Sequence, residues 1–297
     1  MLRLFHCDHH AFALPADHKF PSEKYRLLRE KLAQTGRFRF SESPAVSESL
    51  LAATHDSIYV RSFLDGTVDP RIMRRIGFPW SEGLVRRTLA SVGGTLSAAD
   101  DALNYGFGGN LAGGTHHALR EEGAGFCVFN DIAVVARNLL ESRRVGRVAV
   151  VDLDVHQGDG TAVLLAGEPR AITLSLHGRN NFPFRKQRSS IDIELADGTE
   201  DDEYLMTLDS VLPQVAEFVP DIVFYQSGVD ALATDRLGRL SLTPAGMAIR
   251  DERVAGLCRS LGVPLVITLG GGYSKPIAAT VDAHAATFLT AARILAA

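Results

Sequence analysis

The stretch that decides the fold of this chain is VAVVDLDVHQGDGT, residues Val148 to Thr161. Its apolar first half is typical of a strand buried on both faces, and the glycines near its end break that strand. Asp152, Asp154 and His156 follow one another at intervals of two residues. Residues two apart in a strand project to the same side, and carboxylates and imidazoles are metal ligands. The stretch therefore predicts a metal site at the carboxyl end of a strand, where open α/β sheets keep their active sites.

Further apolar segments end at polar or glycine-rich residues and alternate with stretches of helical spacing. This alternation is typical of an α/β fold with a parallel β-sheet flanked by helices on both faces. The other predicted strands are Leu2–Cys7, Ala171–Leu176, Asp221–Gln226 and Pro264–Leu269. The predicted helices are Glu82–Asn104, Phe129–Ser142, Glu200–Phe218, Pro244–Leu261 and Lys275–Leu295. Because no internal repeat or long linker divides the chain, we expect residues 1–297 to form a single domain.

The composition excludes several classes of function. The chain has 297 residues, 46% of them hydrophobic, which is enough for a well-formed core. Its formal net charge of -4 gives no general basic field, so we expect no direct binding of nucleic acid. Three widely spaced cysteines support neither a disulfide framework nor a CxxC zinc site. The N-terminal segment lacks a signal-peptide core and no run reaches the ~18 apolar residues of a membrane span, so we expect a cytoplasmic protein.

A third protein ligand for the metal is predicted at another strand end. Asp230 in SGVDALATDRLG is the best candidate, because Gly228 permits a sharp turn just beyond the apolar run. Two aspartates and a histidine with an open coordination position suit a catalytic divalent ion, zinc in the first place or Fe2+. Such an ion acidifies a bound water and polarises a carbonyl. A turn-forming acid is the alternative interpretation of Asp230.

Two other motifs supply groups for proton transfer. His116 and His117 in GGTHHA are adjacent and point in different directions, which suits two separate acid–base groups that each need a carboxylate. Asp152 and Asp159 are available for that purpose. Tyr273 in TLGGGYS follows three glycines at a strand end, from where a phenol can donate to a developing oxyanion. A polar loop and an ordinary glycine-rich turn are the alternatives.

Six motifs together resemble the histone deacetylase family, which has the arginase–deacetylase fold. They are GGTHHA (113–118), GAGFCVFND (123–131), VDLDVHQGDGT (151–161), TLSLH (173–177), SGVDALATDRLG (227–238) and TLGGGYS (268–274). The resemblance covers nearly the whole chain, and the segment ELADGTEDDEYL (194–205) looks most like the class IV branch and its bacterial relatives. It implies a deacylase acting on an acylated lysine of a peptide or protein, or on a related acylated amine such as an acylpolyamine.

The resemblance also implies the ions and the surfaces of the site. Zinc would be held by Asp154, His156 and Asp230, in agreement with the choice made from the residues. A monovalent cation, K+, would be bound beside it by Asp152, Asp154, His156, Ser175 and Leu176. The substrate-binding residues would be Gly125, Phe126, Phe182 and Gly271.

The catalytic roles follow from the same resemblance. Asp152 would pair with His116, which would tune the electrostatics, and Asp159 would pair with His117. His117 would act as general base and then as general acid, while Tyr273 would donate its hydroxyl to the substrate carbonyl oxygen. The aspartate at position 159 stands where many class II and class IV members have asparagine, so we expect a more basic His117 than in those relatives.

One further departure and two rival functions accompany this interpretation. Lys24 stands near the position where class I enzymes have an arginine beside an internal channel. A binuclear manganese hydrolase of the arginase type needs a further acid two residues past His156, where this chain has Gly158. A catalytically silent zinc protein that binds acylated ligands is the alternative from outside the enzymes.

Overall fold

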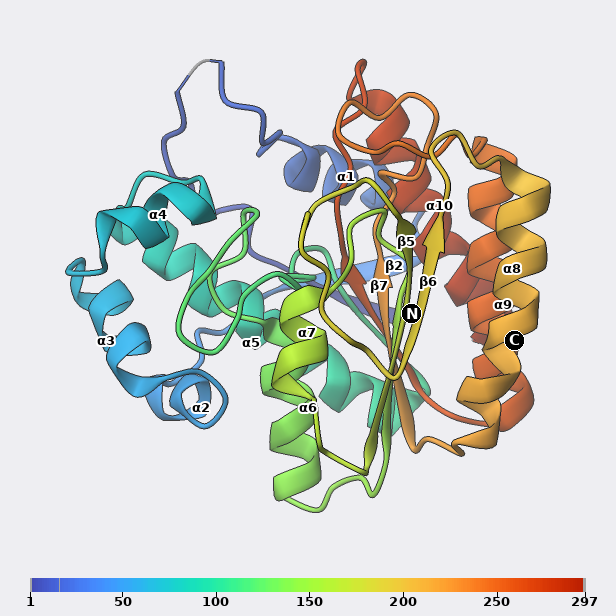
Figure 1. Ribbon diagram of the computed structural model, residues 1–297, viewed down its shortest axis with the longest axis horizontal. Coiled ribbons are helices and arrows are strands. Elements are labelled where there is room, and N and C mark those ends of the chain that lie inside the picture. Colours follow the sequence, from blue (N-terminus) through green and yellow to red (C-terminus); the bar gives the residue numbers. More distant parts are fainter. Residues whose placement is uncertain (1, 16, 296–297) are drawn as a thin grey trace.

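A parallel sheet forms the centre of the fold. In the computed structural model, which describes residues 2–15 and 17–295, eight strands form one sheet in the order β2-β1-β3-β8-β7-β4-β5-β6 (Figure 1). Every pair of neighbouring strands in it is parallel, which confirms the predicted α/β class. The strands are β1 (Leu2–His6), β2 (Phe38–Glu42), β3 (Phe107–Asn110), β4 (Val148–Asp152), β5 (Ala171–Gly178), β6 (Ile191–Leu195), β7 (Ile222–Ser227) and β8 (Leu265–Leu269).

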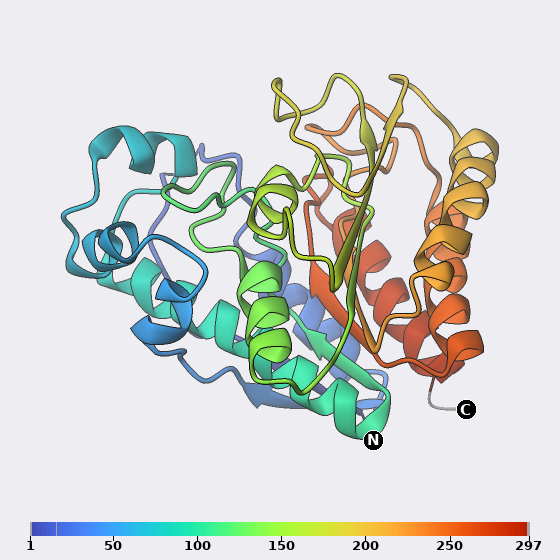
Figure 2. The same ribbon diagram turned by 60° about the horizontal axis from the view of Figure 1, so that its bottom comes forward.

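Helices cover both faces of this sheet. Figures 1 and 2 show α8 and α9 on one side and α6 on the other. The helices are α1 (Lys24–Ala33), α2 (Glu48–Ala52), α3 (Ser57–Asp65), α4 (Pro70–Ile76), α5 (Glu82–Tyr105), α6 (Asp131–Glu141), α7 (Asp159–Leu164), α8 (Asp201–Glu217), α9 (Pro244–Leu261) and α10 (Ala278–Leu295). Within the described ranges no helix has the length and apolar character that a membrane crossing requires.

The strand β4 shows why the sheet is buried on both sides. Ala149 and Val151 belong to the core cluster shared with α1, α8, α9 and α10. Val148 and Val150 face the opposite way and belong to the cluster shared with α5 and α6. Successive side chains of a strand alternate between the faces, so an uninterrupted apolar run needs a helix layer on each side.

A smaller apolar cluster stands beside the main sheet. It joins α2, α3 and α4 to the first half of α5, and Figures 1 and 2 show these helices projecting to the left of the sheet. Phe63 and Phe129 pack edge to face at its centre, with ring centroids 5.4 Å apart. Phe78 and Phe126 lie at its border with the sheet, with ring centroids 5.3 Å apart. This cluster thus supports an aromatic wall beside the carboxyl edge of the sheet.

Several short elements differ from the sequence-based expectations. The strand β3 has the sequence FGGN and was not predicted. A Cβ at Gly108 would lie 1.7 Å from the carbonyl oxygen of Ala98, so glycine is required where α5 crosses the strand. The edge strands β2 and β6 and the helices α1, α2, α3, α4 and α7 were likewise not predicted. The last helix begins at Ala278 rather than Lys275, because the residue before Pro276 is disfavoured in a helix.

Candidate active site

The predicted site residues converge at the carboxyl edge of four neighbouring strands. β3, β8, β7 and β4 are adjacent in the sheet, and each is followed by one of the predicted motifs. His116 and His117 follow β3, Tyr273 follows β8, Asp230 follows β7, and the pair Asp154 and His156 follows β4. Parallel strands place their carboxyl ends at one edge, so segments far apart in the chain meet there.

Asp154, His156 and Asp230 form a compact set of ligand atoms. One ligand atom from each lies within 4.8 Å of the others. His156 Nδ1 is 3.0 Å from Asp154 Oδ1 and 3.0 Å from Asp230 Oδ2. The second oxygen of each carboxylate accepts a backbone hydrogen bond, from Gly271 N–H at 2.6 Å and from Val155 N–H at 2.9 Å. These bonds hold the remaining oxygens toward the histidine.

The electrostatics of this set fit a divalent cation. Asp154 and Asp230 are fully buried. Burial lowers the pKa of His156, but its hydrogen bonds to the two aspartates outweigh this and raise the pKa to about 10. Burial and the charge of Asp154 raise the pKa of Asp230 to about 7. Two buried carboxylates and an imidazole that converge in this way form a donor set that zinc accepts.

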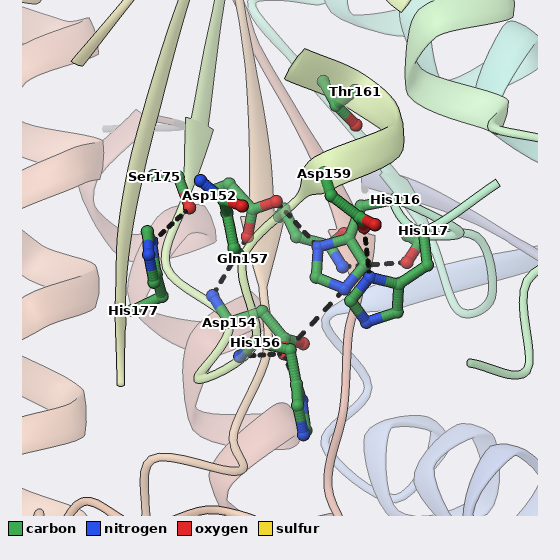
Figure 3. Close-up of polar contacts among 12 residues, drawn as sticks. His116, His117, Asp152, Asp154, His156, Gln157, Asp159, Thr161, Ser175 and His177 are labelled. Atoms are coloured by element: carbon green, nitrogen blue, oxygen red, sulfur yellow. Dashed lines mark hydrogen bonds and ion pairs between the residues drawn. The ribbon is translucent and has the colours of Figure 1, made fainter. Parts of the chain in front are cut away.

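Each histidine of the HH motif has its own carboxylate. His116 Nδ1 is 2.7 Å from Asp152 Oδ2, and His117 Nδ1 is 2.7 Å from Asp159 Oδ1 (Figure 3). Figure 3 shows the two rings beside one another, with centroids 4.1 Å apart. Asp159 is the first residue of α7, and Asp152 is the last of β4. Both pairings expected from the resemblance are therefore present as contacts.

The two rings differ in their preferred charge. Burial lowers the pKa of His116, but Asp152 and Asp154 outweigh burial and raise the pKa to about 9. Burial and the neighbouring charge of His116 lower the pKa of His117 to about 4, against the opposing effect of Asp159. The contact with Asp159 therefore does not raise the pKa of His117 above the ordinary value of a histidine. These opposite shifts favour the protonated form of His116 and the neutral form of His117.

The residues expected to bind a monovalent cation also lie together. Asp152 and Ser175 are directly paired in the register of β4 and β5. Asp152 Oδ1 accepts a hydrogen bond from the backbone N–H of Asp154 at 3.1 Å. Ser175 Oγ lies 2.9 Å from His177 Nδ1, and Leu176 between them is fully buried. Figure 3 shows Ser175 and Asp152 next to each other, above Asp154 and His156.

Two cavities meet at the metal-binding residues. His117, His156, Gly125, Phe126 and Tyr273 line both of them. The inner cavity, of about 80 Å³, continues past these residues to further side chains and contains Gly271 but not Phe182. These further lining residues include Phe12, Phe20, Lys24, Tyr25 and Arg87. The outer cavity is the mouth, formed with Asn180, Asn181, Phe182, Phe184, Leu237 and Arg239.

The expected substrate-binding residues take three different positions. Gly125 and Phe126 adopt φ values of +53° and +67°, and backbone hydrogen bonds to Arg75 and Ile76 hold them there. Phe182 lies edge-on to the His117 ring, with centroids 4.8 Å apart. Gly271 is packed against the metal-binding carboxylates rather than along the mouth.

Two buried basic residues support the site: Lys24, which the resemblance placed near an internal channel, and Arg250, which the sequence did not indicate. Lys24 is buried and its Nζ donates to the carbonyl oxygen of Gly270 at 3.0 Å. The fully buried Arg250 of α9 donates to the carbonyl oxygens of Gly228 at 2.6 Å and Leu153 at 3.3 Å. It thereby ties together the loops of two predicted metal ligands. A basic residue within a helical pattern gives no sign of such burial, because most lysines and arginines are exposed.

Comparison with known proteins identifies the family of the chain. The histone deacetylase domain matches residues 18–289. An uncharacterized protein of Picosynechococcus sp. is 42% identical over 275 residues, which cover 91% of this chain and 92% of that protein. Histone deacetylase 2 of Arabidopsis thaliana is 34% identical over 274 residues, which cover 87% of this chain and 70% of that protein. None of these matches assigns a class, so class IV membership stays a prediction.

Solved structures share the whole architecture. An acetylpolyamine aminohydrolase from Burkholderia pseudomallei superposes with a TM-score of 0.82 over 99% of both chains, at 19% identity. The HD domain of HDA15 superposes with a TM-score of 0.78 over 98% of this chain and 88% of that chain, at 22% identity. At these identities the likeness shows the fold, which is the arginase–deacetylase fold. The family match and the fold agree: the chain belongs to the histone deacetylase family.

Proposed function

We propose that this chain is a zinc-dependent amidohydrolase that removes acetyl or longer acyl groups from N-acyl-lysine side chains. We further propose that residues 1–297 act as one catalytic domain. Membership of the histone deacetylase family supports hydrolysis of an acyl amide. The observation that carries the proposal is the shared cavity, because one space is lined by His117, Tyr273 and two of the three metal-binding residues. An amide entering it meets a base, an oxyanion donor and a metal site at once.

Zinc would be held by Asp154, His156 and Asp230. When bound there it supplies Lewis acidity, which acidifies water and polarises an amide carbonyl. The hydrogen bond to Asp159 keeps the proton of His117 on Nδ1 and leaves Nε2 free to accept one. Because burial and His116 keep the pKa of His117 low, this ring is neutral at pH 7. His117 therefore takes a proton from the attacking water and afterwards returns it to the leaving amine.

Tyr273 and His116 stabilise the charge that develops on the substrate. Burial and the charge of Asp230 raise the pKa of Tyr273, so its hydroxyl stays protonated and can donate to the oxyanion. A single donor of this kind is worth about 3 to 4 kcal/mol in the transition state. The cationic ring of His116, whose Nε2 is 4.0 Å from Asp154 Oδ1, adds positive charge beside the ligands.

K+ is the proposed occupant of the neighbouring cation site. Asp152 is fully enclosed between His116 and the backbone of Asp154 and accepts a hydrogen bond from each. The carboxylates and carbonyls there are the hard oxygen ligands that alkali and alkaline-earth cations prefer. A cation behind the ligand loop would offset the buried negative charge and stiffen the loop. Loss of activity in K+-free buffer with recovery on adding K+ would support this assignment.

The mouth of the site favours acyl-lysine over acylpolyamine. Among the described residues that line the mouth, none is a carboxylate, and Arg239 adds a cation. An acylpolyamine keeps an ammonium group a few carbons from its amide. The carboxylate of Asp197, which contacts the lining residues Asn180 and Arg239, is already paired with Arg239 at 3.1 Å, so the ammonium group would have to compete with a guanidinium for it. The stem of an acyl-lysine is apolar over the same length and matches Phe126 and Phe182.

A substrate panel on the zinc-loaded protein tests the proposed function. The panel contains acetyl-, octanoyl- and myristoyl-lysine peptides together with N-acetylputrescine and N-acetylspermidine. We expect turnover of at least one acyl-lysine peptide and a kcat/KM at least about tenfold lower for the polyamines. A preference for the polyamines would overturn the substrate assignment. Binding of every peptide without hydrolysis would instead identify a catalytically silent protein.

A further inference from the structure

Two adjacent residues of the loop between β7 and α9 hold the backbone of Tyr273, and the residue before them contacts the side chain that follows Tyr273. Asp235 Oδ2 accepts a hydrogen bond from the backbone N–H of Tyr273 at 2.6 Å. Nε of Arg236 donates to the carbonyl oxygen of Tyr273 at 3.2 Å. Thr234 Oγ1 lies 3.0 Å from the hydroxyl oxygen of Ser274, the next residue. Both backbone polar groups of Tyr273 are thus bonded to adjacent side chains of one loop.

The Asp235 carboxylate is itself fixed. Its Oδ1 accepts hydrogen bonds from the backbone N–H groups of Leu237 at 2.8 Å and Gly238 at 3.0 Å. The backbone N–H of Asp235 donates to the carbonyl oxygen of Leu232 at 2.9 Å. The carboxylate is half-buried, and hydrogen bonds to an ionised acceptor are about twice as strong as neutral ones. Asp235 therefore provides a rigid anchor rather than a loose surface contact.

Gly270 and Gly271 are held by side chains of the site: the Gly270 carbonyl oxygen accepts from Lys24 Nζ at 3.0 Å, and Gly271 N–H donates to Asp154 Oδ2 at 2.6 Å. Gly272 separates these two anchored residues from Tyr273. It lies outside any helix or strand and has a φ of +155°. Glycine leaves the backbone more freedom than any other residue would. The nearest aromatic ring across the cavity, Phe126, is 6.1 Å from the Tyr273 ring between centroids, which is a loose contact. The Tyr273 ring is buried, with Lys24 Nζ 5.3 Å from its centroid, and beyond the flexible Gly272 the bonds from Asp235 and Arg236 fix the backbone from which the phenol projects.

We propose that Asp235 and Arg236 are positioning residues that set the phenol of Tyr273 against the metal-binding site. This inference rests on the proposed function, in which the phenol donates to the oxyanion. The same loop bears Asp230, a proposed metal ligand, five residues before Asp235. One rigid loop thereby fixes both the ligand and, through hydrogen bonds, the oxyanion donor. The distance between them is then set by a single segment rather than by two loops that move independently.

The first test is a double-mutant cycle that combines Asp235→Asn with Tyr273→Phe in the zinc-loaded protein. In the wild type, backbone N–H groups donate to both oxygens of the Asp235 carboxylate. Asparagine replaces one of these oxygens by an N–H₂ group, which cannot accept, so one of the anchoring hydrogen bonds is lost. We expect kcat to fall about tenfold with KM within about twofold and zinc content unchanged. In the Tyr273→Phe background the same substitution should change kcat by less than about twofold, because the hydroxyl that it positions is absent. A similar loss in both backgrounds would overturn the inference.

A second measurement does not depend on turnover. The protein contains six tyrosines, so 3-fluorotyrosine labelling gives a resolvable ¹⁹F spectrum in which Tyr273→Phe identifies the Tyr273 signal. We expect Asp235→Asn to shift or broaden that signal and to leave the others in place. An unchanged Tyr273 signal refutes the positioning role. If the wild type hydrolyses no substrate, the proposed function fails, but the spectrum still decides whether the loop holds Tyr273.

Two further variants keep the experiment interpretable. Arg236→Met removes the bond to the Tyr273 carbonyl and serves if Asp235→Asn does not fold. Asp221→Asn is the matched control, because Asp221 also accepts two backbone hydrogen bonds, from Gly146 at 2.6 Å and Arg147 at 2.8 Å. It lies just before β7, at the end of the strand away from the site. We expect this control to leave both kcat and the Tyr273 signal unchanged.

Discussion

Replacement of Gly271 by alanine tests the geometry of the metal-binding residues directly. A Cβ at this position would lie 1.7 Å from Asp230 Oδ2 and 2.5 Å from Asp230 Cγ. Because such contacts below 3.0 Å essentially never occur, either the carboxylate or the glycine loop has to retreat by roughly 1 Å or more. The backbone conformation itself is not the obstacle, since Gly271 is not among the glycines with positive φ. The substitution therefore acts through the ligand.

A displacement of this size is large for a metal ligand. Ligand distances in such sites are specified to about 0.2 Å, and substitutions that only disturb the partners of ligands lower the metal affinity by 10- to 100-fold. If Asp230 retreats, one of three protein ligands leaves the ion. If the loop retreats instead, Asp154 loses its 2.6 Å hydrogen bond from Gly271 N–H. We expect a zinc affinity at least about 100-fold lower in either case.

Competition against a zinc-binding chromophore, with elemental analysis after gel filtration, measures this loss. Gly256→Ala is the matched control, because Gly256 lies inside α9 with no atom within 4 Å of the new Cβ. That control should retain its zinc and gain about 0.5 to 1 kcal/mol of stability from helix propensity. Gly271→Ala protein that folds and binds zinc within threefold of the wild type would refute the proposed ligand geometry.

Three further outcomes follow from single side chains. Tyr273→Phe should lower kcat by about 100- to 1000-fold with zinc retained, and near-normal turnover of an acyl-lysine peptide would exclude Tyr273 as the oxyanion donor. Burial lowers the pKa of His55 to about 4, so the unfolded state, with its ordinary pKa near 6.5, binds a proton that the folded state excludes. The free energy of unfolding should therefore fall as the pH drops from about 6.5 toward 4, and His55 alone should account for about 2 kcal/mol of this loss at pH 5. In urea unfolding, His55→Gln should show a free energy of unfolding that depends less on pH than that of the wild type. An equal pH dependence in the two proteins would contradict the assignment. Arg239→Glu places a carboxylate at the mouth and should raise kcat/KM for N-acetylputrescine relative to an acetyl-lysine peptide by about fivefold, whereas an unchanged ratio would remove the charge argument for lysine substrates.

The sequence by itself determined the class of the fold and the residues that meet at its edge. The apolar run of β4, the polar residues two apart after it and the glycines behind them are local signals, because strand period and turn chemistry act over a few residues. The pairing of motifs was also within reach, since parallel strands bring their carboxyl ends to one edge. From these signals alone, Asp154, His156 and Asp230 were predicted to bind one metal ion together.

Only the tertiary structure decided how those residues are held and charged. Arg250 and Asp235 act on segments that follow other strands, and nothing in their own neighbourhood in the chain indicates those contacts. The different pKa shifts of His116 and His117 arise from burial and from charges that belong to separate loops. The segment FGGN is a strand because it pairs with β1 and β8, and it contains Gly108 because α5 passes close to it, not because its residues favour a strand. Long-range packing and desolvation leave no pattern among neighbouring residues of the chain. The sequence therefore indicated which residues carry the chemistry of the site, but not which residues hold them in place.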